Sequence, residues 1–100
     1  MHNAYDVAAV VSGARLDDEG AERRLRLFGC EPKVVTHQDL TVFVNRERAL
    51  NPRRAMGAFM RHLENAQVKF DYITIGGAEN ALTDYARDVL GDDTPPPAFA

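Results

Sequence analysis

The chain has 100 residues, of which 45% are hydrophobic and 27% charged, so we expect one globular domain rather than a disordered chain or a fibrous repeat. The longest apolar run, Val7–Val11, is far shorter than the ~20 residues of a membrane-spanning helix, and we find no secretory signal at the start. Twelve Lys and Arg against 15 Asp and Glu give a net charge of −3, which disfavours a protein dedicated to coating nucleic acid.

The cysteine and histidine content predicts neither disulfides nor metal sites. A single cysteine, Cys30, excludes a disulfide within the chain and a metal site built from several cysteines. A reducing, cytoplasmic compartment suits that content. The three histidines, His2, His37 and His62, have none of the spacings that are typical of zinc ligands. We therefore expect no metal and no cofactor.

The first half of the chain predicts a strand, a helix and a hairpin. Tyr5–Val11 is rich in valine and almost without alternation, which is typical of a strand buried on both faces. Acidic residues that begin at Asp17, followed by arginines, have the charge order that a helix dipole favours, and Gly29 suits the left-handed position after the last turn. The β-branched segments Lys33–Thr36 and Leu40–Val44 predict two hairpin strands.

The second half predicts a helix, a strand and a further helix. Asn51 suits the N-cap and Pro52 the first helical position, and an apolar stripe with helical spacing follows as far as Ala66. Val68–Ile75 alternates as a half-buried strand does. The pattern from Ala78 to Leu90 predicts the last helix.

The element order predicts an α+β fold. Strand, helix, strand, strand, helix, strand is the order of the ferredoxin-like β-α-β-β-α-β fold, an antiparallel sheet with two helices on one face, and here an extra C-terminal helix follows. We assign residues 1–91 to this single domain. Residues 92–100 form a Pro-rich tail without a helix or strand pattern. We expect the tail to dock through Phe99.

Alternation along the strands sorts their side chains into two sets. If the two crossover helices cover the aliphatic set, the other face shows aromatic rings, those of Phe43, Phe70 and Tyr72. Such an apolar patch is normally covered. Three covers are open: the last helix, with Leu82 and Tyr85 reaching down; a second copy in a symmetric dimer; or another macromolecule.

Four arginines form a second candidate surface. Arg46, Arg48, Arg53 and Arg54 fall close together with Glu47 as the one acid among them. Arg53 and Arg54 lie in the first turn of a predicted helix, where the helix dipole disfavours cations. Either acidic neighbours such as Glu47 neutralise these arginines, or they bind an anion, because a guanidinium pairs readily with carboxylate and phosphate. An acidic protein surface is the favoured partner.

These patterns predict a small, non-enzymatic protein-protein interaction module. It would be a regulator or an inhibitor that occludes a larger macromolecule through the aromatic sheet face and the arginines, or it would pair with a second copy. One alternative is an RRM-like domain that binds single-stranded nucleic acid, although Leu40–Val44 lacks the typical Lys/Arg-Gly-aromatic pattern. A second alternative is a cofactor-free enzyme of the dimeric α+β-barrel type, in which His37, oriented by Asp39, transfers protons.

Overall fold

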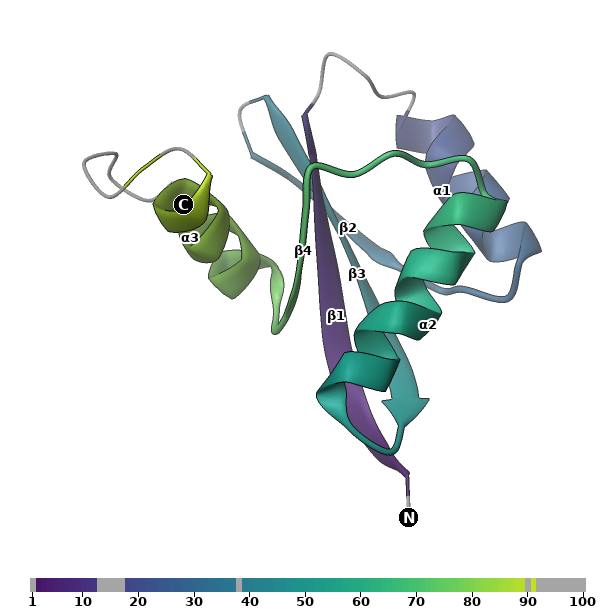
Figure 1. The fold of residues 1–100 in the computed structure, drawn as a ribbon. Helices are drawn as coiled ribbons and strands as arrows, with labels where there is room; N and C mark the ends of the chain where they lie inside the picture. The colour runs from purple at the N-terminus through teal and green to yellow at the C-terminus, as the bar shows by residue number, and fades with distance from the viewer. Residues whose placement is uncertain (1, 13–17, 38, 90, 92–100) are drawn as a thin grey trace.

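The structure is a computed structural model, and it describes residues 2–12, 18–37, 39–89 and 91 (Figure 1). The element order matches the predicted one. No helix in the described part of the chain has the length and apolar character needed to cross a membrane. In chain order the elements are β1 (Asn3–Ser12), α1 (Asp18–Leu27), β2 (Lys33–His37), β3 (Leu40–Ala49), α2 (Pro52–Asn65), β4 (Tyr72–Ile75) and α3 (Ala78–Asp88).

The four strands form one antiparallel sheet in the order β2-β3-β1-β4. β1 pairs with β3 along its whole length, from Asn3 opposite Ala49 to Ser12 opposite Leu40. β2 pairs only with the first half of β3, because its ladder begins with Lys33 opposite Val44. β3 therefore continues beyond β2 for the length of Asn45–Ala49.

This extension of β3 corrects the prediction, which ended the strand at Val44. Asn45, Glu47 and Ala49 are buried, whereas Arg46 and Arg48 are exposed, so the segment keeps the two-residue period of a strand. Two of its inward positions are polar. Hydrophobicity therefore did not mark the segment as a strand.

Helices α1 and α2 lie together on one face of the sheet (Figure 1). Asn51 caps α2 as predicted, because its Oδ1 accepts a hydrogen bond from the Arg54 backbone N–H at 2.9 Å, and Pro52 follows. The helix then buries Ala55, Phe59 and Leu63 against the sheet. The predicted turn after α1 is also confirmed: Gly29 has a φ of +88°, a conformation that glycine adopts without strain.

Helix α3 lies on the opposite face (Figure 1), so the described elements form three layers. Ala81, Leu82 and Tyr85 are buried against a second cluster, to which β1 contributes Ala8 and Val10. Of the three covers left open by the sequence, the structure shows the first, the last helix with Leu82 and Tyr85 reaching down. The helix packs on β1, β3 and β4.

The predicted aromatic face is wrong for two of its three rings. Phe43 is fully buried in the cluster under α1 and α2, and Phe70 packs against the same cluster. Only Tyr72 lies on the α3 side. The aliphatic set of β3 was assigned to the wrong face: Val42 and Val44 lie under α3, so their neighbour Phe43 points to α2. Phe70 lies before the start of β4 and is not part of a strand, so strand alternation does not apply to it.

Candidate functional site

The four predicted arginines gather where β3 ends and α2 begins. Arg46 and Arg48 are the outward positions of the β3 extension, and Arg53 and Arg54 lie in the first turn of α2. All four are exposed. The short connection between the two elements keeps both pairs at the same end of the molecule. We call this group the arginine surface.

Most of the arginine surface is not neutralised. Arg46 Nε lies 3.3 Å from Asp6 Oδ1, but the arginine side chain is 73% exposed, and such surface pairs contribute little. Within the described part of the chain, Arg48, Arg53 and Arg54 form no ion pair, and the first turn of α2 contains no acid.

Glu47, which the sequence offered as one possible counter-charge for the arginines, points away from them. It lies among buried groups between β3 and α2, where its Oε2 accepts a hydrogen bond from Asn45 Nδ2 at 2.7 Å. Its Oε1 lies 3.3 Å from His62 Nε2. His62 is therefore a half-buried partner of Glu47. The sequence contained one signal for this site: Asn45 and Glu47 share the strand face of buried Phe43.

The thiol next to this polar group is not a nucleophile at neutral pH. Cys30 is buried in the cluster between the sheet and the first two helices. Burial, followed by the charge of Glu47, raises the pKa of Cys30 to about 11. Because the thiolate is the reactive form, the thiol stays protonated and acts as a small apolar side chain.

A hollow of about 460 Å³ lies on the α3 side of the sheet, next to the arginine surface. Val35 of β2 and Val44 of β3 line it, as do the charged side chains of Lys33, Arg46 and Asp6. It exists because α3 packs mainly on β1, β3 and β4, so the part of this face near β2 stays uncovered. Glu31 lines the hollow as well, so its apolar floor is bordered by two cations and two acids.

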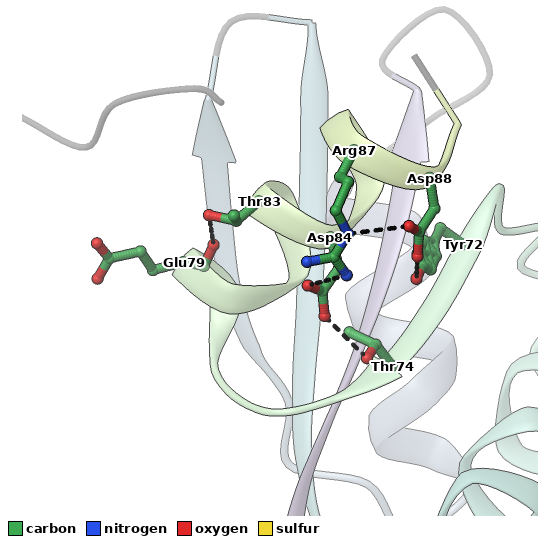
Figure 2. A network of polar contacts seen from close by, with 7 residues as sticks. All are labelled: Tyr72, Thr74, Glu79, Thr83, Asp84, Arg87 and Asp88. Carbon is green, nitrogen blue, oxygen red and sulfur yellow. Dashed lines mark hydrogen bonds and ion pairs between the residues drawn. The ribbon is translucent and has the colours of Figure 1, made fainter. Parts of the chain in front are cut away.

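A polar network anchors α3 to the sheet (Figure 2). Tyr72 OH donates to Asp88 Oδ2 at 2.5 Å, and Thr74 Oγ1 donates to Asp84 Oδ2 at 3.3 Å. Arg87 bridges both carboxylates, at 2.9 Å from Asp84 and 3.1 Å from Asp88. Asp84 and Asp88, one turn apart on α3, are thus both engaged within the chain.

This network predicts a pH range for the docking of α3. Its hydrogen bond to Asp88, followed by burial, raises the pKa of Tyr72 from 10.0 to about 12; the same bond and Arg87 lower the pKa of Asp88 from 3.8. The tyrosine contribution is complete below pH 10 and is lost as the pH rises through about 12. The aspartate contribution is complete above its ordinary pKa and is lost as the pH falls through the lowered value.

An alkaline titration followed by tyrosinate absorbance tests this network. We expect one tyrosine to titrate near pH 12, and Tyr72→Phe to remove that step. Asp88→Asn should bring the step back toward pH 10, whereas the control Glu79→Gln, at an exposed position of the same helix, should leave it in place. Persistence of the step in Tyr72→Phe would contradict the assignment.

The remaining predicted site residues do not join the arginine surface. Phe43 lies in the core under α2, Phe70 is half-buried against that core, and Tyr72 lies under α3. His37 is half-buried opposite Leu40, at the other end of β3 from the arginines. Phe99 and the rest of the tail lie outside the described residues.

Neither a metal cluster nor a known relative identifies the site. Among the described residues, no group of histidine, cysteine, aspartate and glutamate side chains is arranged to hold a metal ion. No protein-family model matches the chain, and no curated protein or solved structure matches it significantly. The arginine surface and its surroundings are therefore the features that indicate a function.

Proposed function

We propose that this chain is a protein-binding module without enzymatic activity, which covers an acidic region of a larger macromolecule and so regulates or inhibits it. The observation that carries this proposal is the lack of ion-pair partners, among the described residues, for Arg48, Arg53 and Arg54. Clustered guanidinium groups repel one another, and an opposing patch of carboxylates relieves that repulsion while fixing the orientation of the complex.

The proposed binding surface differs from the one that the sequence predicted. The three aromatic rings do not form part of it: Phe43 is fully buried, Tyr72 packs under α3, and Phe70 follows the end of α2, whereas the arginines lie at its start. The uncovered hollow at Val35 and Val44 replaces them as the apolar part of the surface. An apolar centre bordered by charges is the usual composition of a protein-protein interface.

The two alternative functions have less support. An RRM-like domain stacks bases on rings at an open sheet surface, but Phe43 is fully buried and Tyr72 packs beside Tyr85 of α3, with ring centroids 6.3 Å apart. A dimeric α+β barrel packs sheet against sheet, and α3 occupies much of the face that would do so. His37 also lies outside the lining of the hollow.

We further propose that the fold is ferredoxin-like and that the protein works in the cytoplasm. Strand β3 lies between β1 and β2, and β1 lies between β3 and β4, so each helical crossover spans an intervening strand, as in a split βαβ unit. The single buried thiol, Cys30, suits a reducing compartment.

A charge-reversal experiment tests the proposed function. The probe is a fluorescein-labelled oligoglutamate peptide, and its anisotropy is titrated with the full chain at low and at physiological salt. Arg48→Glu, Arg53→Glu and Arg54→Glu together should weaken binding at least about tenfold, since each surface charge contributes roughly 0.5 kcal/mol and reversal adds repulsion.

A matched control separates the surface from the net charge. Arg23→Glu, Arg61→Glu and Lys69→Glu change the charge by the same amount at exposed positions away from β3, so we expect binding within about twofold of wild type, inside the scatter of surface substitutions. Equal weakening in both triple variants would reject the arginine surface as the binding site. Tighter binding of a single-stranded oligonucleotide of equal charge would favour the nucleic-acid alternative instead.

A further inference from the structure

The β3 extension has a free backbone edge. Antiparallel pairing with β1 satisfies one side of Asn45–Ala49, while β2 begins only at Lys33, opposite Val44, and does not reach this segment. On the side away from β1, within the described part of the chain, the backbone of Arg46–Ala49 makes no further hydrogen bond. Such an edge presents N–H and C=O groups that an additional strand can pair with.

There is space beside the start of this edge. A hollow of about 270 Å³ is lined by Gly29 and Glu31 on one side and by Asn45, Arg46 and Glu47 on the other. The Glu31 backbone N–H donates to Asn45 Oδ1 at 3.3 Å, so the connection between α1 and β2 stays close to Asn45. Beyond this point β3 continues away from β2, as its path in Figure 1 shows.

The side chains along the edge select for acidic partners. Arg46 and Arg48 project from the same face of β3 and are exposed. A strand added beside them places its own alternate side chains on that face, directly opposite or diagonal to the two guanidinium groups. Arg53 and Arg54 extend the positive charge beyond the end of the strand. Carboxylates at alternate positions of the incoming strand would neutralise this surface.

We propose that the free edge of β3 binds an extended acidic segment of the partner protein as an added fifth strand. This inference rests on the proposed function and specifies how the arginine surface engages its partner. Main-chain hydrogen bonds supply affinity that does not depend on sequence, and the arginines select carboxylates at every second residue.

A second copy of this chain fits the same edge poorly. A twofold antiparallel pairing keeps opposed residues on the same face, so it would set Arg46 against Arg48 of the other copy, or one of the two arginines against its own counterpart. Like charges placed directly opposite destabilise a strand pair. An acidic strand is also a poor fit to the outer edge of β4, since β4 is short and Asp71 directly precedes it.

Backbone methylation of a probe peptide tests strand addition. The probe is a labelled peptide of alternating glutamate and valine. In an added strand only alternate amides face β3. N-methylation of one alternate set should therefore weaken binding at least about tenfold, since it removes several hydrogen bonds. Methylation of the other set should leave binding within about twofold, and a peptide of alternating lysine and valine should not compete.

Amide hydrogen exchange supplies an independent readout. On binding of the unmethylated peptide, alternate amides of Arg46–Ala49 should exchange more slowly, whereas amides at the middle of α2 should not change. Binding that requires the arginines but tolerates both methylated sets equally would overturn strand addition while leaving the proposed function intact. Absence of binding to either acidic peptide, at low salt and with wild-type protein, would overturn both.

Discussion

Phe43→Ala is expected to destabilise the protein by about 3–5 kcal/mol, the range for removing a large aromatic side chain from a core. The ring is fully buried between the sheet and α2, in the same cluster as Phe59 and Leu63. Its removal takes away both the apolar contacts and the filled volume, and a close-packed interior recovers only part of that loss by relaxation. Urea unfolding followed by circular dichroism measures the change.

Phe28→Ala is the matched control for this prediction. It removes the same ring from a position just after α1 where the side chain is 47% exposed, and we expect a change of no more than about 1 kcal/mol. A small effect of Phe43→Ala on stability, together with weaker binding of the acidic probe, would contradict the buried position and would indicate that this ring belongs to the partner-binding surface.

Glu47→Ala is expected to destabilise the protein by roughly 2–3 kcal/mol, although glutamates are usually dispensable surface residues. The change removes the acceptor for Asn45 Nδ2 and the partner of His62 Nε2. Asn45 is itself buried, so its Nδ2 is left without this acceptor in a place that water reaches poorly, and this penalty exceeds the net value of the lost bond. Thermal and urea unfolding should agree on the change.

Two further variants refine the Glu47 prediction. Glu64→Ala removes an exposed carboxylate from α2 and should change stability by less than about 0.5 kcal/mol. Glu47→Gln keeps an oxygen acceptor for Asn45 and should lose less stability than Glu47→Ala. If Glu47→Ala destabilised the protein no more than Glu64→Ala, then Glu47 would be free to neutralise the arginines. The arginine surface would then need no acidic partner.

Local signals in the sequence predicted the helix boundaries well. Asn51 and Pro52 mark the start of α2 because an N-cap side chain and a proline act on backbone groups within one turn. Gly29 marks the end of α1 because a positive φ is a property of one residue. Predictions of this kind depend only on neighbouring residues and are independent of the rest of the fold.

Assignments that depend on the far side of the sheet failed for a physical reason. Alternation shows that Val42 and Phe43 point in opposite directions, but it does not show which helix each one meets. The burial of Glu47 depends in the same way on α2, since His62 approaches it from that helix. Both errors have one cause: alternation alone does not show which face of β3 lies under α2 and which lies under α3.

Composition, periodicity and capping residues by themselves determined the α+β class, the order of the elements and the clustering of the arginines along the chain, because these follow from short-range chemistry. Only the tertiary structure decided that α3 covers the second face, that β3 extends beyond β2, and that Glu47 points inward, which leaves Arg48, Arg53 and Arg54 without a counter-charge among the described residues. Those outcomes depend on contacts between segments far apart in the chain, whose packing decides which of two opposite directions each strand residue takes.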